Sequence, residues 1–462
     1  MQRFAIILAA GKGTRMKSNI EGMPKVAFPL LGKPMICYVL DALSGLRFDK
    51  LCVIAGYGKE TVASLASPYG EIFTQEEQKG TADAVSAARA LADKEGVTLV
   101  CSGDTPLLTD RTIEALLLAH ETNHNDATVL TSLVRDPYGY GRIKRNGAAL
   151  ERIVSQKECT PELSAIHEVN TGVYAFDNHL LFSALDRYLA LPAKEYHLSD
   201  IVNALINDGR RVGAFAIGDD TEALSVNDRY QLSVATKALR ERINKRWMIH
   251  GVTFEDPDTA YVGPEVKLSR DTVIRSGVHI YGKSTIGHQN VIGPDCYFEN
   301  VTIGERNKIQ YCHLVDTIVD DDTDLGPYFR TRKGVHIHSK AHVGNFNEMK
   351  NVEFGEGSKC AHLSYLGDAD IGEGVNVGCG TIIANYDGVN KFRSAIGDRV
   401  FLGSGSTIIS PVHIGDEAFV AAGSTVNKDV PSGDMAIARA HQENKPGYAK
   451  VLKEKALAKK KK

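Results

Sequence analysis

From about residue 260 onward an aliphatic residue recurs every six positions, and this repeat restricts the fold more than any other feature. The longest unbroken register runs through Ile396, Leu402, Ile408, Ile414, Val420 and Val426. Such a repeat is typical of a parallel β-helix, in which each six-residue unit forms one flat side of a triangular coil of about 18 residues. Unrelated strands of a β-sandwich would not keep this register, so we expect a β-helix here.

The N-terminal half has a different pattern, in which short aliphatic runs alternate with helical periodicity. The expected strands are Phe4 to Leu8, Leu51 to Ala55, Thr98 to Cys101, Ala127 to Leu133 and Val169 to Phe176. This alternation predicts a Rossmann-like α/β domain with a mostly parallel sheet, whose ligands lie beyond the carboxyl ends of the strands.

A helix is predicted between the two halves. Ala235, Leu239, Ile243 and Trp247 follow one another at four-residue spacing, with Asn227 at the expected start. The sequence therefore predicts a nucleotide-binding domain over 1–226, a linker helix over 227–250 and a β-helix domain over 251–462.

Composition excludes several classes of protein. Apolar residues make up 43% of the 462 residues, and the net charge of −3 gives no basic field for nucleic acid. The eight cysteines form no CxxC pair, which argues against a zinc site or a disulfide framework built from them. The apolar start is cut short by Gly11 and Lys12, and no later window is long enough for a membrane span, so a cytoplasmic protein without membrane or nucleic-acid partners is expected.

The segment Leu8 to Met16, LAAGKGTRM, directly follows the first strand. Glycines at such a turn let backbone N–H groups approach a phosphate, and we expect the following helix to present its positive end. Arg15 occupies the position of the third Rossmann glycine, and no GK[ST] motif is present, so neither a dinucleotide fold nor a P-loop is supported. Asp104 ends another strand and is placed at the same sheet edge, where a carboxylate suits Mg²⁺.

LAAGKGTRM followed by PKV resembles the signature of sugar-1-phosphate nucleotidyltransferases. The resemblance implies that Arg15 and Lys25 clamp the triphosphate and that Asp104 and Asn227 hold Mg²⁺. Ser155 stands where that family usually has a glutamate that contacts the amino sugar. The residues implied at the UTP and sugar site are Leu8, Ala9, Ala10, Gly11, Lys25, Gln75, Gly80, Thr81, Ser102, Gly103, Asp104, Gly141, Ser155, Asn170 and Asn227.

Two segments of the C-terminal half, His342 to Lys350 and Ala361 to Asp368, interrupt the six-residue rhythm and are predicted to be functional loops. Together with Asn385-Tyr386-Asp387 and Lys391 they resemble the acetyltransferase half of the bifunctional N-acetylglucosamine-1-phosphate uridyltransferase/glucosamine-1-phosphate acetyltransferase family. The resemblance covers essentially the whole chain. It implies left-handed coils and a homotrimer with sites between neighbouring subunits.

In that family the amine of glucosamine 1-phosphate attacks acetyl-CoA, and His362 matches the general base, a role that suits imidazole near neutral pH. Mg²⁺-dependent uridylyl transfer from UTP follows and supplies precursors of peptidoglycan and lipopolysaccharide. The residues implied for glucosamine 1-phosphate are Arg332, Lys350, Tyr365 and Asn376. Those implied for acetyl-CoA are Cys379, Asn385, Tyr386, Ser404, Ala422 and Arg439.

Two alternatives stay open. The chain could be a monofunctional sugar-1-phosphate nucleotidyltransferase whose β-helix is structural or regulatory, or a non-enzymatic assembly subunit with the same two-domain layout. A purely structural β-helix needs neither His362 nor Lys350, and an assembly subunit needs no Asp104, so the bifunctional enzyme is the favoured hypothesis.

Overall fold

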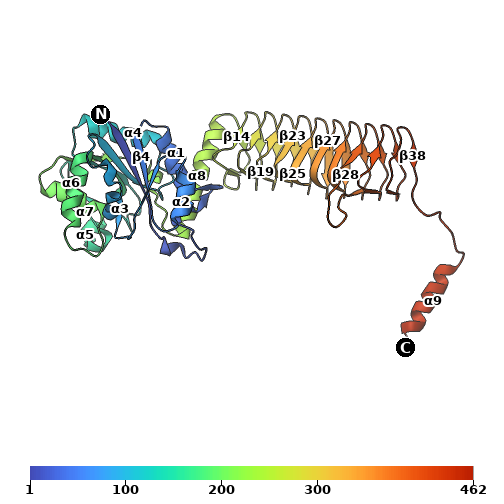
Figure 1. Ribbon diagram of the computed structural model, residues 1–462, viewed down its shortest axis with the longest axis horizontal. Helices are drawn as coiled ribbons and strands as arrows, with labels where there is room; N and C mark the ends of the chain where they lie inside the picture. Colours follow the sequence, from blue (N-terminus) through green and yellow to red (C-terminus); the bar gives the residue numbers. More distant parts are fainter. Residues whose placement is uncertain (461–462) are drawn as a thin grey trace. The chain divides into compact units, whose positions relative to one another are not determined.

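The computed structural model describes residues 1–460, which form two compact units, the first ending at Lys245 and the second starting at Arg246. The dividing point lies inside helix α8 (Arg229–Ile249), not at either end of the 227–250 segment. Figure 1 shows an α/β fold in the first unit and stacked β-helix coils in the second.

The first unit is built on one sheet in the order β11-β7-β10-β6-β1-β4-β5, with the β8–β9 hairpin attached to β10. The five predicted strands are present as β1, β4, β6, β7 and β10. Strand β10 runs antiparallel to both of its neighbours, β6 and β7, while the other pairs along this path are parallel. The strands are β1 (Arg3–Ala9), β4 (Lys50–Ala55), β5 (Glu71–Thr74), β6 (Val97–Ser102), β7 (Ala127–Leu133), β8 (Gly141–Asn146), β9 (Ala149–Val154), β10 (Glu168–Asp177) and β11 (Val212–Ala216).

Both faces of this sheet are covered because successive side chains of a strand point to opposite sides. In β1, Phe4 and Ile6 pack into one core, and Ala5 and Ile7 pack into the other. The helices contributing to the first core are α3 (Thr81–Ser86), α6 (Asn178–Leu189) and α7 (Leu198–Asn207). Those contributing to the second core are α1 (Met35–Ser44), α2 (Lys59–Ala66) and α4 (Asp110–Thr122).

The second unit is the predicted parallel β-helix. Ile396 pairs with Ile414, and Leu402 pairs with Val420, each 18 residues further along the chain. All six aliphatic residues of the 396–426 register are buried, at most 4% exposed. The short strands form an 11-stranded and a 16-stranded sheet running from β12 (Thr253–Phe254) to β38 (Met435–Ala436).

The two segments predicted to be loops are strands instead. They form β26 (His342–Asn345), β27 (Glu348–Phe354), β28 (Lys359–His362) and β29 (Tyr365–Ile371). Their coils are one residue shorter than the 18-residue coils of the 396–426 register, since His342 pairs with Lys359, 17 residues later. The missing residue disturbs the six-residue repeat of the sequence, but the strands of successive coils stay paired. The clear protrusion follows β31 (Ile382–Ala384), where Tyr386 and Lys391 pair across a hairpin.

Helix α8 begins two residues later than predicted. The Asp228 carboxylate accepts a hydrogen bond from the backbone N–H of Gln231 at 2.8 Å, so Asp228 and not Asn227 caps the helix. The side chain of Asn227 is thereby left for the site described below. Within residues 1–460, none of the helices has the length and apolar character needed to span a membrane.

Candidate functional site

A cavity of about 400 Å³ lies beyond the carboxyl ends of β1 and β6 in the first unit. Parallel strands end together at this edge, so residues distant in the sequence meet there. The predicted residues that line it are Leu8, Ala9, Ala10, Gly11, Arg15, Lys25, Gln75, Gly80, Thr81, Ser102, Asp104 and Asn227.

Arg15, Lys25 and Asp104 are joined with Asn227 in one network of side-chain contacts. The ammonium of Lys25 contacts the Asp104 carboxylate and also donates to Asn227 Oδ1 at 3.0 Å. Arg15 donates to the same Asn227 oxygen at 3.0 Å. The side chains of Lys25 and Asp104 are only 14% and 11% exposed, so their attraction is weakly screened. One cation therefore already sits between the two oxygens expected to bind Mg²⁺.

The glycine turn differs from the prediction in its second half. It leads into a 3-10 helix of three residues, Thr14–Met16, which is too short to present a helix dipole. Gly13 has φ +64°, and an added Cβ would lie 2.6 Å from the Cβ of Lys25. The glycine at position 13 therefore allows the Lys25 segment to pass close to the turn.

We expect Gly13→Ala to lower the free energy of unfolding by about 1–3 kcal/mol, because it combines a left-handed backbone with a steric clash. Gly11→Ala is the matched control, since an added Cβ there meets nothing within 4 Å. It should leave the melting temperature unchanged. Equal melting temperatures for both variants would contradict this role of Gly13.

Gln75, Gly80 and Thr81 form a second part of the cavity wall. The buried amide nitrogen of Gln75 donates to the Gly80 carbonyl at 3.1 Å and to Asp83 Oδ2 at 2.6 Å, which uses both of its hydrogens. Gly80 has φ +114°, and a Cβ there would meet the Tyr196 carbonyl at 2.3 Å. The Gln75 side chain is therefore held in one orientation.

Four predicted residues do not line the cavity: Gly103, Gly141, Ser155 and Asn170. The N–H of Gly103 donates to the Leu8 carbonyl at 2.9 Å. Gly141 and Asn170 face each other across β8 and β10. Ser155 caps a short 3-10 helix and bonds Glu158 Oε2 at 3.1 Å. The glutamate nearest this position is therefore engaged in a capping box.

Six further residues line the cavity without having been predicted: Gly13, Thr14, Val26, Gln78, Ala84 and Glu195. Gly13, Thr14 and Val26 belong to motifs that the sequence analysis quoted. Glu195 follows a surface segment of ordinary composition, and no local pattern marks it.

A second group of cations lies in the β-helix unit. Arg332 and Lys350 are directly paired across β25 (Arg330–Ile337) and β27. The amine of Lys391, on the protruding hairpin, lies against that of Lys350 and is the main cause of the lowered pKa of Lys350. Arg332 Nη1 also lies 3.4 Å from Glu348 Oε1, so one carboxylate borders the group. Three cations gathered in this way favour binding of a doubly charged anion.

His362 is exposed at the end of β28. Its Nδ1 lies 3.0 Å from Asn345 Oδ1 on the neighbouring coil. Because an amide oxygen can only accept, Nδ1 carries the hydrogen and Nε2 is left unprotonated in the neutral ring. Asn345 was not among the predicted site residues.

The buried Asp368 holds two asparagines of adjacent coils. It accepts from Asn351 Nδ2 at 2.7 Å and also from the amide of Asn385. The Asn385 side chain is therefore held by Asp368 of the preceding coil. The neighbouring Tyr386 is 58% exposed on the hairpin. Tyr365 lies on β29 directly beside Glu348 of β27, two residues from the position opposite Lys350.

The residues expected around acetyl-CoA follow one edge of the β-helix. The Cys379 carbonyl accepts from the N–H of Gly405, next to Ser404, and the Ser404 carbonyl accepts from Gly423, next to Ala422. Cys379, Ser404 and Ala422 thus occupy corresponding places on three successive coils. Arg439 donates to the Ala422 carbonyl at 2.5 Å, and Asn376 lies three residues before Cys379 on the same coil.

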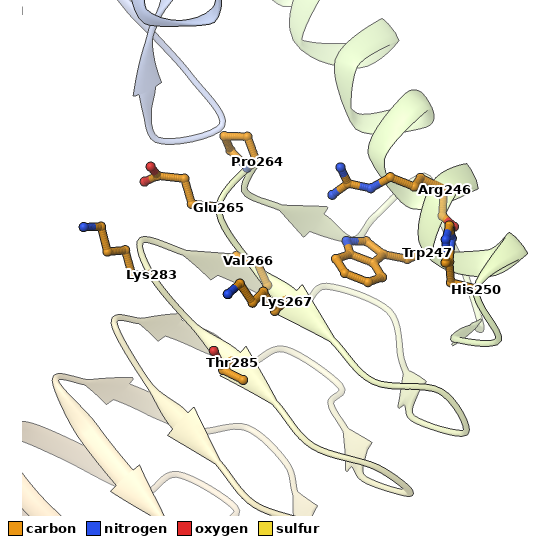
Figure 2. Close-up of a pocket in the computed structure, with 9 residues that line it drawn as sticks. All are labelled: Arg246, Trp247, His250, Pro264, Glu265, Val266, Lys267, Lys283 and Thr285. Atoms are coloured by element: carbon orange, nitrogen blue, oxygen red, sulfur yellow. The ribbon is translucent and has the colours of Figure 1, made fainter. Parts of the chain in front are cut away.

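A larger cavity of about 710 Å³ lies in the second unit and contains none of the predicted residues. Figure 2 shows it between the end of α8 and the first coils of the β-helix, with the indole of Trp247 beside it. We assign the candidate sites to the two groups above, where the reactive side chains are.

Comparisons with known proteins identify both halves of the chain. Residues 4–223 match the family model described as nucleotidyl transferase, and residues 395–428 match that described as hexapeptide repeat of succinyl-transferase. The chain is thus a nucleotidyl transferase joined to a hexapeptide-repeat domain.

Relatives match along nearly the whole length. The bifunctional protein GlmU of Lactobacillus johnsonii is 47% identical over 97% of both chains. That of Listeria monocytogenes is 45% identical over 98% of this chain and 99% of its own, and that of Enterococcus faecalis is 44% identical over 97% and 98%. The chain belongs to the family of the bifunctional protein GlmU.

Proposed function

We propose that this chain synthesises UDP-N-acetylglucosamine with two sites, acetylating glucosamine 1-phosphate in the β-helix unit and transferring a uridylyl group to the product in the α/β unit. The observation that carries the proposal is the presence of two separate groups of reactive side chains in one chain. One group is Lys25, Asp104 and Asn227. The other is Lys350 with Lys391, and the same unit carries His362 at the end of β28.

In the α/β unit, the sugar phosphate attacks the α-phosphorus of UTP and expels pyrophosphate. Arg15 and Lys25 are placed to balance the negative charge that develops on the leaving group. Gln75, whose two amide hydrogens are already used, presents its carbonyl oxygen to the N3–H of uracil. Backbone N–H groups of the Leu8–Gly11 segment face the phosphates.

Asp104 and Asn227 would hold Mg²⁺, which when bound neutralises phosphate charge. The fit rests on the Lys25 ammonium, which already places a positive charge between these two oxygens. One carboxylate and one neutral oxygen, with phosphate and water completing the shell, suit this ion.

In the β-helix unit, Arg332, Lys350 and Lys391 bind the phosphate of glucosamine 1-phosphate. His362 Nε2 takes a proton from the amine as that amine attacks the thioester carbonyl of acetyl-CoA, and free CoA leaves. Asn345 keeps the ring in the productive tautomer. The row Cys379, Ser404, Ala422 and Arg439 lines the path of acetyl-CoA, and Arg439 is the cation for a CoA phosphate.

We further propose a homotrimer in the cytoplasm, where UTP and acetyl-CoA are available. His362, Ser404 and Ala422 are exposed on one chain, and a neighbouring subunit would enclose them. A solution mass other than three times 50.2 kDa would contradict the trimer.

The sugar is tested by measuring UTP-dependent pyrophosphate release with a panel of sugar 1-phosphates. We expect a clear preference for N-acetylglucosamine 1-phosphate, with glucosamine 1-phosphate becoming a good substrate only when acetyl-CoA is added. If acetyl-CoA has no effect, the monofunctional alternative holds. If another sugar is preferred, the sugar specificity proposed for the α/β unit is wrong.

A further inference from the structure

Two histidines and two carboxylates meet on one side of the β-helix, and none of them is assigned to either reaction. His336 and His338 are two positions apart, so both side chains point outward while Ile337 between them is buried in the core. Asp320 follows β23 (Thr317–Val319) on the preceding coil, and Glu353 lies in β27 on the next coil. Three successive coils contribute to this cluster.

The contacts in the cluster are close and orderly. Asp320 reaches His336 Nε2 at 3.0 Å and His338 Nδ1 at 3.2 Å. The opposite ring nitrogens, His336 Nδ1 and His338 Nε2, lie 3.3 and 3.2 Å from a single oxygen of Glu353. The side chains of His336, His338 and Asp320 are between 26% and 38% exposed, so an ion from solvent can reach them.

We propose that Asp320, His336 and His338 bind a divalent transition-metal ion of the zinc class. One ligand atom from each residue lies within 4.8 Å of the other two. Two ligands about 2.1 Å from a tetrahedral ion are about 3.4 Å apart, close to the observed Asp320–histidine distances. Two imidazoles and one carboxylate bind such ions more strongly than they bind Mg²⁺, which prefers oxygen ligands.

Glu353 completes the arrangement as a positioning residue. A histidine that binds a metal through one nitrogen usually donates its other N–H to a carboxylate, which fixes the ring and raises its basicity. One oxygen of Glu353 is in reach of both of these N–H groups. The bound ion would link the coils of Asp320 and His336, and Glu353 would extend that link to a third coil.

The proposal is tested by titrating Zn²⁺ into the chelator-treated full-length protein in excess Mg²⁺, with calorimetry and thermal unfolding as readouts. We expect one Zn²⁺ per chain and a rise in melting temperature. His336→Ala and His338→Ala should weaken binding by at least about 100-fold, and Glu353→Gln by about 10–100-fold.

His342→Ala is the matched control, because His342 faces a single carboxylate, Asp324, at 3.6 Å on the adjacent coil and cannot chelate in this way. It should bind Zn²⁺ as the unchanged protein does. Equal Zn²⁺ binding by the unchanged protein and by His336→Ala would overturn the proposal, as would the absence of Zn²⁺ binding in the unchanged protein. Neither outcome would affect the two proposed reactions.

Discussion

Replacing Asp104 with alanine is expected to abolish pyrophosphate release from UTP and N-acetylglucosamine 1-phosphate while CoA release from acetyl-CoA continues. The substitution removes the only carboxylate of the proposed Mg²⁺ pair and leaves the Lys25 ammonium bound to Asn227 alone. We expect a loss larger than the roughly 10–100-fold that accompanies removal of a residue supporting a metal ligand. Both products are measured on the same preparation.

The control for this variant is Asp186→Ala. Asp186 forms an ion pair with Arg89 in the same unit, but both side chains are more than half exposed, and such pairs contribute little. It should leave both reactions unchanged. Simultaneous loss of both reactions in Asp104→Ala, with a normal melting temperature, would contradict the independence of the two sites.

The β-helix could be predicted from the sequence because its core repeats. Each buried aliphatic side chain of the 396–426 register is set by the same local geometry, so a six-residue period is sufficient evidence. The strands of the α/β unit were predicted for a similar reason, since β1, β4 and β6 are buried on both faces and read as continuous aliphatic runs. The antiparallel direction of β10 depends on how the chain connects it to its neighbours, and the aliphatic pattern of a strand does not reveal its direction.

The candidate sites could be predicted only where a motif carries them. Arg15 and Lys25 belong to the motif that follows β1, and Asp104 follows the end of β6. All three meet in the cavity because β1 and β6 are parallel neighbours that end at the same edge of the sheet. Asn345 lies in a segment that the interrupted repeat marks, but its contact with His362 depends on the pairing of neighbouring coils, which the repeat does not specify. Glu195 is brought to the cavity wall by tertiary packing of a segment without a distinctive pattern. The predicted loops at 342–350 and 361–368 were wrong because a coil shortened by one residue disturbs the repeat yet keeps its strands.

His362→Ala is expected to have the reverse effect of Asp104→Ala. Without a general base, acetyl transfer should fall by about 10²–10⁴-fold, because the attacking amine then loses its proton only to water. Pyrophosphate release with N-acetylglucosamine 1-phosphate should be unchanged, since every residue of the cavity in the α/β unit is intact. The two rates are measured as CoA thiol release and pyrophosphate release.

Asn345 provides the sharper test of how this base works. In Asn345→Ala the hydrogen on His362 Nδ1 loses its acceptor, so the ring can adopt the other tautomer. That tautomer carries its hydrogen on Nε2, which then cannot take a proton from the amine. We expect a lower kcat for acetyl transfer with little change in KM. Asn345→Asp should restore much of the rate, because a carboxylate oxygen also accepts from Nδ1. If the aspartate variant is no better than the alanine variant, Asn345 does not act through the hydrogen bond to His362, and the assignment of Nε2 as the basic atom loses its support.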